Sequence, residues 1–258
     1  MRTRFSVLIA VLVCILLSSM VAFGQQRFDP KDLSGYWLRN TVRPKDHPPL
    51  TPAGVAAMKG RVPDDDTRLP NESNDPMYRC NPQGFPRLMW EENEPLEIIM
   101  TPNRILRLFQ WERRPLEIWM DGRALPSGET LDSIGPNWYG HSVGRWEGNT
   151  LVVLTTGVEE RAWLDEYGNP KSYDAVFEER FTRTGPDTIE GQLTINDPKM
   201  FTATWIHPKS TFTRMKPEAT EFFGWKGLFS GLTEAICAPM NELDDFNKRI
   251  RDPGIFGK

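Results

Sequence analysis

The stretch "GPNWYGHSVGRWEGNTLVV", residues 135–153, decides the fold. Within it, Gly148-Asn149 is a signal for a two-residue hairpin turn, because glycine accepts the positive φ that a primed turn requires. The turn sets the register of the flanking strands, which pairs Glu147 with Thr150, Trp146 with Leu151, Arg145 with Val152, Val143 with Leu154 and His141 with Thr156. Side chains alternate along a strand, so His141, Val143 and Arg145 share one face of the predicted hairpin.

The sequence around the hairpin repeats the same kind of pattern. Residues 96–217 alternate between apolar and polar positions in short runs, and Gly, Pro, Asn and Asp interrupt these runs at regular intervals. Such even spacing of strands and turns is typical of an antiparallel meander that closes on itself. We therefore predict a mostly β protein: an antiparallel, lipocalin-like β-barrel of about 8–10 strands with short flanking helices.

The segments on either side of the barrel have a different composition. Residues 25–95 are rich in Pro, Asp and Asn and are predicted to wrap irregularly around the barrel. They contain one strand, over 33–39, and one short helix with Thr51 as its N-cap and Pro52 at its first position. Residues 218–258 are predicted to form a helical or irregular tail packed on the barrel, since apolar residues recur there at roughly helical spacing.

Residues 1–24 have the pattern of a secretory signal peptide. Arg2 and Arg4 precede a long apolar run, and Ala22 and Gly24 supply the small residues of a cleavage site. Cleavage after Gly24 predicts an exported protein, either periplasmic or secreted. The alternative is an uncleaved anchor, because an apolar run of this length can span a bilayer. The membrane would then be a partner through this segment alone.

Charge and cysteine content exclude some classes of function. The formal net charge is −4, and no basic cluster follows the leader, which argues against nucleic acid as a partner. Cys80 and Cys237 remain after the leader, and an even count in an exported chain predicts a disulfide between them. The chain has only three histidines and no His or Cys set at metal-ligand spacing, so neither a metal nor another cofactor is expected.

His141 is the first candidate catalytic residue. Histidine exchanges a proton near neutral pH, which suits a general base or a hydrogen-bond donor in a pocket. Arg145, on the same face, suits the binding of a carboxylate or an enolate oxygen. The alternatives are a histidine that is hydrogen-bonded at a strand end and an arginine that keeps the surface soluble. His207 precedes a turn proline and is expected at the surface.

Glu179 is the second candidate catalytic residue. In "DAVFEERFTR" it alternates with Phe177 and Phe181, so all three side chains point to one face. An acid between two phenylalanines is costly to bury unless it is paired or protonated, which makes it a candidate acid or base. The alternative is an interior salt bridge to Arg107 or Arg214.

Loops and aromatic residues supply the other candidates. Asp165 in "LDEYGNP" is the third catalytic candidate, and "MDGRALP" offers Asp121 and Arg123 at a strand end. Both sequences are also ordinary turn sequences. Nine tryptophans and fourteen phenylalanines suit a cavity lined by aromatic groups. The expected ligand-binding residues are Arg145, Arg123, Asp121, Trp119, Phe177, Phe181 and Trp205.

Two resemblances accompany these patterns. "GYW", at 35–37, is similar to the G-x-W start of lipocalin-type barrels, in which the tryptophan packs against an arginine from a late strand. That likeness implies that Trp37 packs against Arg214.

A longer resemblance covers residues 79–237. "WYGHSVGRWEGNTLVV", "ERAWLDEYGNPKS" and "ERFTRTGPDTIEGQLTINDPKMFT" resemble a large family of exported bacterial proteins of no established activity, as do "MDGRALP" and "CNPQGFPRLM". In that family an acid often follows Leu-Val-Val, whereas this chain has Leu154. The resemblance thus implies a domain type and export, but no reaction.

Three functions are consistent with the sequence. The first is binding of a small, largely apolar or aromatic molecule, such as a terpenoid, sterol or phenolic compound, in the barrel cavity. The second is a cofactor-free isomerase, hydratase or lyase, in which His141 acts with Glu179 or Asp165 and an arginine stabilises negative charge. The third is a structural envelope protein whose aromatic residues only fill the core. The sequence does not indicate an oligomeric state.

Overall fold

The computed structural model describes residues 28–40, 44, 48–63, 72–91, 94–111, 114–216, 221–222, 225–226, 231–232 and 237. The predicted signal peptide, residues 1–24, lies outside the described residues, as does most of the predicted tail. Of that tail, β11 (Glu221–Phe222) pairs with β12 (Trp225–Lys226) in an antiparallel ladder. Among the described residues, no helix is both long enough and apolar enough to span a bilayer.

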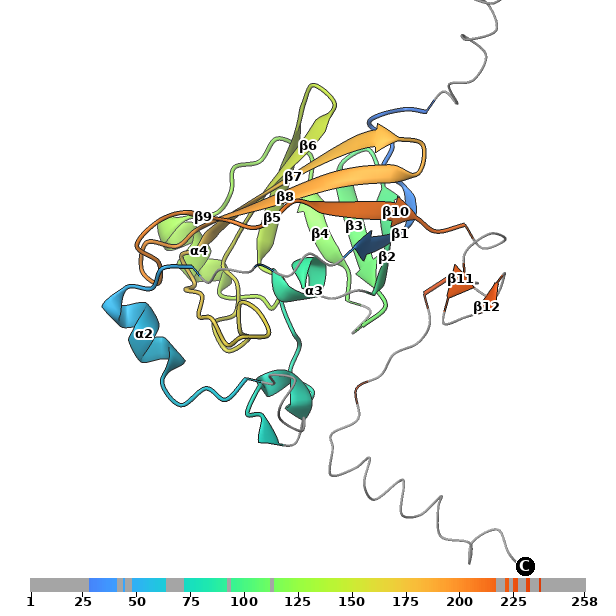
Figure 1. Ribbon diagram of the computed structural model, residues 1–258. Coiled ribbons are helices and arrows are strands. Elements are labelled where there is room, and N and C mark those ends of the chain that lie inside the picture. Colours follow the sequence, from blue (N-terminus) through green and yellow to red (C-terminus); the bar gives the residue numbers. More distant parts are fainter. Residues whose placement is uncertain are drawn as a thin grey trace, which may run out of the picture.

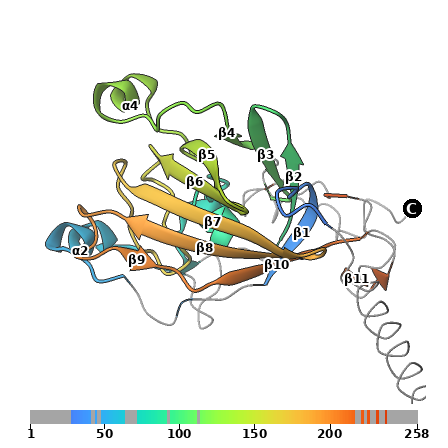
Figure 2. The same cartoon turned by 90° about the horizontal axis from the view of Figure 1, so that it is seen from above.

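Ten strands form one sheet in the order β10-β1-β2-β3-β4-β5-β6-β7-β8-β9. Because β10 also pairs with β8, the nine strands other than β9 close into a barrel (Figures 1 and 2). The strands are β1 (Gly35–Asn40), β2 (Pro95–Met100), β3 (Arg104–Phe109), β4 (Leu116–Trp119), β5 (His141–Glu147), β6 (Thr150–Thr156), β7 (Val176–Gly185), β8 (Thr188–Asn196), β9 (Trp205–Ile206) and β10 (Ser210–Arg214). The predicted β-barrel is confirmed.

The predicted hairpin is also confirmed, in its full register. β5 and β6 are antiparallel, with Glu147 opposite Thr150 and His141 opposite Thr156. Gly148 has a φ of +59°, the positive value that the turn requires. Local turn chemistry was therefore sufficient to set this pairing.

One strand pair departs from the predicted antiparallel pattern. β4 and β5 are parallel, with Ile118 beside Ser142 and Trp119 beside Val143. Residues 120–140 connect them and contain helix α4 (Gly128–Ile134). A parallel pair needs a long crossover, because the chain must return to the starting end of the sheet. The barrel is therefore mixed, and the prediction of a purely antiparallel barrel was wrong at this pair.

The first strand and first helix form where local sequence predicts them. In α2 (Pro52–Met58), the Thr51 side chain accepts a hydrogen bond of 3.1 Å from the backbone N–H of Gly54. Trp37 lies in β1, and the guanidinium carbon of Arg214, at the end of β10, is 4.4 Å from the centroid of its ring. The contact implied by the lipocalin-type "GYW" start is therefore present.

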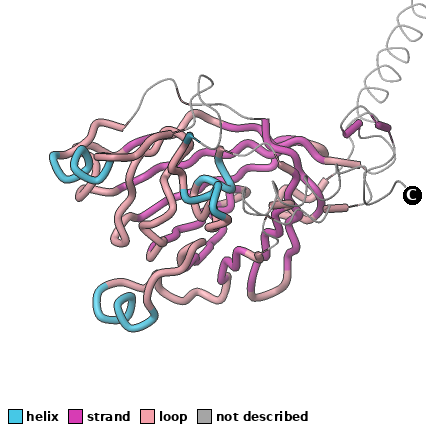
Figure 3. Tube along the Cα trace, turned by 90° about the horizontal axis from the view of Figure 1, so that it is seen from below, coloured by secondary structure: helices cyan, strands magenta, loops and turns pink. Residues whose placement is uncertain are grey.

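The interior of the barrel is filled by a segment from the part of the chain expected to wrap around it. Residues 83–90, which end in helix α3 (Arg87–Trp90), are buried. Figures 1 and 3 show where α3 lies relative to the strands. Phe85 packs edge-on against Phe177 of β7 at 5.3 Å, and Trp90 stacks on Phe181 at 5.7 Å. Among the described residues, the space inside the barrel between Leu33, Met89 and Phe212 is about 10 Å³. This volume is about that of one water-sized probe, so this space among the described residues is too small for the expected ligand.

A buried polar network joins this internal segment to the barrel wall. Glu179 of β7 is fully buried and accepts hydrogen bonds of 2.9 and 3.0 Å from Arg107 of β3. The indole N–H of Trp90 donates to the same carboxylate at 2.8 Å. Of the two alternatives for Glu179, the salt bridge to Arg107 is therefore the one that forms. A buried carboxylate needs such partners, because an isolated charge in the interior is strongly unfavourable.

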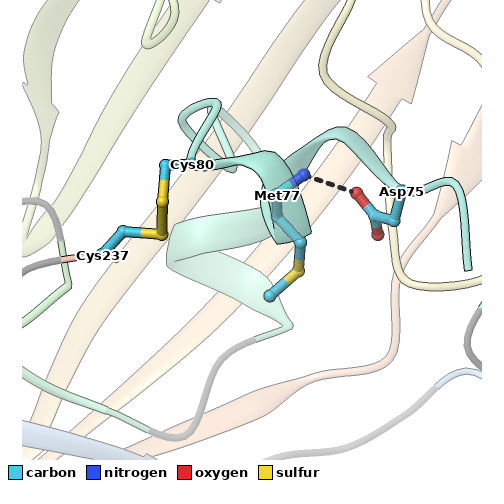
Figure 4. Close-up of a disulfide and its surroundings, with 4 residues drawn as sticks. All are labelled: Asp75, Met77, Cys80 and Cys237. Carbon is cyan, nitrogen blue, oxygen red and sulfur yellow. Dashed lines mark hydrogen bonds between the residues drawn. A yellow bond between two sulfur atoms is a disulfide. The ribbon is translucent and has the colours of Figure 1, made fainter. Parts of the chain in front are cut away.

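The predicted disulfide between Cys80 and Cys237 is present, with a Cα–Cα distance of 5.6 Å (Figure 4). Cys80 directly follows the 3₁₀ helix η2 (Pro76–Arg79), which Asp75 caps at its N-terminus. The Asp75 carboxylate accepts from the backbone N–H of Met77 at 3.0 Å and pairs with Arg87 of α3 at 2.5 Å. The bridge therefore ties a late part of the chain to the segment that leads into the barrel interior.

The Arg107–Glu179 pair generates a stability prediction. Glu179→Gln leaves the buried Arg107 guanidinium without its counter-charge and is expected to lower the free energy of unfolding by about 3–5 kcal/mol. Glu178→Gln is the matched control, because Glu178 faces solvent and pairs with Arg180 at 3.2 Å. We expect it to change stability by less than about 0.5 kcal/mol. Urea unfolding measures both.

The double variant Glu179→Leu/Arg107→Met completes this test. It removes both charges together and is expected to recover most of the loss, since no unpaired charge remains. Equal stability of Glu179→Gln and Glu178→Gln would contradict the role given to the pair.

Candidate functional site

An open pocket lies outside the barrel, where the crossover 120–140 returns over the parallel strands β4 and β5. It has a volume of about 570 Å³. Figure 2 shows α4 at the upper left, near β4 and β5, and α2 at the lower left, near β9. Leu116 and Ile118 of β4 point into the barrel core, so the alternate residue Trp119 faces outward and lines the cavity. We call this cavity the crossover pocket.

The rim of the crossover pocket is a charged pair held against an aromatic ring. The guanidinium carbon of Arg123 lies 3.8 Å from the centroid of Trp119. The Asp121 carboxylate accepts from Nε of Arg123 at 3.0 Å and from Nη2 at 2.6 Å. These hydrogen bonds from Arg123 lower the pKa of Asp121, which favours its ionised form. The negative charge of Asp121 and the positive charge of Arg123 therefore balance each other at the rim.

His141 lies at the start of β5 and lines the same pocket. Its Nε2 is 2.9 Å from the carbonyl oxygen of Gly135, which ends α4. A carbonyl oxygen only accepts, so Nε2 must carry the proton that is shared. The hydroxyl of Tyr173 donates to the Leu131 carbonyl at 2.6 Å and fixes α4 from the other side. The helix that walls the pocket is thus anchored by two side chains from outside it.

The structure brings together some of the predicted site residues. Trp119, Arg123 and His141 line the crossover pocket, and Asp121 is the partner of Arg123. Arg145 does not line it. Arg145 is half exposed further along β5 and pairs with Glu147 at 2.7 Å. Of the two interpretations of Arg145, the structure thus agrees with that of an arginine that keeps the surface soluble.

His141 and Glu179 lie on opposite faces of the sheet. Leu154 pairs with Val143 on one side and with Glu178 on the other, whereas Glu179 pairs with Val153. The face that carries His141 therefore continues to Glu178, and Glu179 points into the core. His141 and Glu179 therefore do not meet in one site, because a shift of one residue in register moves a side chain to the other face of the sheet.

The predicted aromatic ligand contacts also divide between sites. Phe177 and Phe181 are buried inside the barrel, against Phe85 and Trp90. Trp205 of β9 packs edge-on against His207 at 5.6 Å. None of these three rings lines the crossover pocket. Phe177 and Phe181 belong to the hydrophobic core, and Trp205 packs against it.

His207 is buried rather than exposed. Its Nε2 lies 3.1 Å from the Glu91 carboxylate and its Nδ1 lies 2.9 Å from the carbonyl oxygen of Pro208. The expectation of a surface position was wrong because Glu91, at the end of α3, supplies a buried partner that is distant in sequence.

Asp165 is likewise buried, in the loop 157–175. Its carboxylate accepts from the backbone N–H groups of Tyr167 at 3.0 Å and Asn169 at 3.1 Å, and from the Asn169 side chain at 2.6 Å. Burial raises the pKa of Asp165, although the hydrogen bonds from Asn169 oppose this. The carboxylate organises its own loop and does not reach His141 in the pocket lining.

Lys171, in the same loop, is a buried cation that the sequence patterns did not single out. Its ammonium donates to the carbonyl oxygens of Ala162 and Trp163. Burial lowers the pKa of Lys171 to about 7, and the nearby cations Arg61 and Arg87 act in the same direction.

The pocket also contains residues that the sequence did not indicate. Ile134 is half exposed and presents an apolar side chain to the pocket from α4, and Val143 does so from β5. The feature of the sequence that could have indicated this pocket was the connection 120–140, which is longer than a hairpin turn requires. Within the described ranges, no three His, Cys, Asp or Glu side chains are grouped as the ligands of one metal ion.

Lys171 generates a prediction on pH dependence. Between pH about 7 and the ordinary lysine value of 10.5, the unfolded chain holds a proton that the folded protein has lost. The free energy of unfolding of the native protein is therefore expected to rise with pH in this window, relative to Lys171→Met, with a limiting slope of about 1.4 kcal/mol per pH unit. Urea unfolding at several pH values measures this slope.

The surface variant Lys199→Met is the control for this experiment, since Lys199 is exposed. It should keep the pH dependence of the native protein. Parallel pH profiles for the native protein and Lys171→Met would refute the assignment.

Comparison of the chain with protein-family models, curated proteins and solved structures found no match. The geometry of the crossover pocket is therefore the basis for a functional proposal.

Proposed function

We propose that the protein binds a small, largely apolar molecule in the crossover pocket. The observation that carries the proposal is the contrast between two spaces: about 570 Å³ in the crossover pocket and about 10 Å³ inside the barrel. Small-molecule sites typically occupy some 300–1,000 Å³ and combine apolar walls with a few polar groups. The crossover pocket combines the apolar side chains of Trp119, Ile134 and Val143 with several polar groups, among them those of Thr130, Asn137 and His141.

The exposed apolar surface of the pocket supports the same proposal. Ile134 is 50% exposed although it lies on a short helix against the sheet. An apolar side chain in a concave site loses contact with water when a ligand covers it, which favours binding. The other large exposed apolar side chains described, Val55 and Ile206, do not line this pocket.

No specific observation favours the enzyme alternative. Its proposed acids, Glu179 and Asp165, are each buried among partners away from His141. The structural alternative accounts for the aromatic rings inside the barrel, but it does not account for Trp119, which faces the pocket.

We also propose that the protein is exported, periplasmic or secreted. Support comes from the signal-like sequence at residues 1–24 and from the Cys80–Cys237 disulfide. Disulfides persist in oxidising compartments.

A fluorescent apolar probe tests the site. N-phenyl-1-naphthylamine is expected to bind the purified protein, and Trp119→Ala should weaken this binding about tenfold through loss of apolar contact. Ile134→Ser should weaken it about fivefold for the same reason. The matched control is Ile206→Ser, because Ile206 is 63% exposed and lies on β9 outside the pocket. Fluorescence titration gives the dissociation constants. Probe binding that is equal in all three variants would refute the site.

A further inference from the structure

The charged side chains of the crossover pocket are already paired within the protein. Arg123 is bound to Asp121, and Glu117 is bound to Arg104 at 3.1 Å. Arg123 and Glu117 are the formally charged residues of the lining, and the remainder, apart from His141, are neutral. A ligand carboxylate or ammonium would therefore have to compete with the carboxylate or guanidinium that each of these side chains already binds.

The orientation of His141 identifies one ring atom that is available to a ligand. Nε2 faces the Gly135 carbonyl at 2.9 Å. The neighbouring Cδ2 packs against Gly157, where a Cβ would lie only 2.9 Å from it. The Cδ2–Nε2 edge is thus turned toward the protein, which leaves Nδ1 on the opposite edge of the ring.

Nδ1 is also the ring atom with hydrogen-bonding capacity left. In neutral imidazole one nitrogen donates and the other accepts, and Nε2 donates to Gly135. In the part of the chain that the structure describes, Nδ1 makes no hydrogen bond. It is therefore an acceptor that a ligand with an O–H group can satisfy.

The apolar side chains that line the pocket, together with its volume, indicate the polarity and size of the rest of the ligand. Trp119 and Val143, laterally paired on β4 and β5, form an apolar floor, and Leu125 and Ile134 face it from the crossover. A space of about 570 Å³ is large enough for a molecule of several rings.

We propose that the ligand of the crossover pocket is an uncharged, multi-ring molecule with a hydroxyl group that donates a hydrogen bond to Nδ1 of His141. This inference rests on the proposed function, since it concerns the same pocket. It narrows the ligand class to neutral phenols and alcohols and excludes carboxylates of similar shape.

Three pyrene derivatives test the inference on the full native chain. 1-Hydroxypyrene has the O–H donor, 1-methoxypyrene lacks it, and 1-pyrenecarboxylate carries a negative charge on the same rings. At mildly alkaline pH, 1-hydroxypyrene is expected to bind about tenfold more tightly than either of the others, because only it can donate to Nδ1. Fluorescence titration measures all three.

His141→Phe provides the second arm of the experiment. Phenylalanine keeps a ring but has no acceptor, so the hydroxyl-to-methoxy preference should fall to about one in this variant. Ile206→Ser, outside the pocket, should retain the preference. Because the comparison of probes is made on the native protein, the result does not depend on the folding of any variant.

The outcomes separate the two proposals. Equal binding of 1-hydroxypyrene and 1-methoxypyrene, or tightest binding of the carboxylate, would overturn the hydroxyl inference and leave the apolar binding site in place. Failure of all three pyrenes and of the naphthylamine probe to bind would overturn both.

Discussion

The ion pair between Arg107 and Glu179 is the interaction on which the rest of the structure depends. It lies inside the barrel, and Trp90 of the internal segment donates to the same carboxylate. Apolar packing alone tolerates many arrangements, whereas a buried charge requires particular partners at particular distances. The pair therefore specifies where the segment 83–90 must sit. With that segment inside, the space between Leu33, Met89 and Phe212 in the described part of the barrel is only about 10 Å³, too small for a ligand.

The crossover between β4 and β5 supplies a larger space. A tight hairpin would have left the outer face of these strands open, but the parallel pairing obliges residues 120–140 to pass back over it. The outward side chains Trp119 and Val143 thereby become the floor of a pocket, and His141 lines it as well. The same departure from antiparallel order that the sequence pattern missed is thus what creates the candidate site.

The polar loop 157–175 stabilises this arrangement from behind. Tyr173 holds α4 through the Leu131 carbonyl, and Gly157 packs against the ring of His141. Asp165 and Lys171 organise the interior of the loop by hydrogen bonds to its backbone and to Asn169. The residue first considered as a catalytic acid, Asp165, therefore acts on the pocket only through the shape of the loop.

The sequence by itself determined the features that depend on neighbours along the chain: the β5–β6 register set by Gly148, the Thr51 cap of α2, and the β-barrel class. It also placed Trp119, Arg123 and His141 among the candidates. Only the tertiary structure decided that β7 turns Glu179 inward while β5 turns His141 outward, that residues 83–90 fill the barrel, and that β4 and β5 are parallel. Alternation shows which side chains share a face, but the choice between core and solvent depends on contacts between segments far apart in sequence.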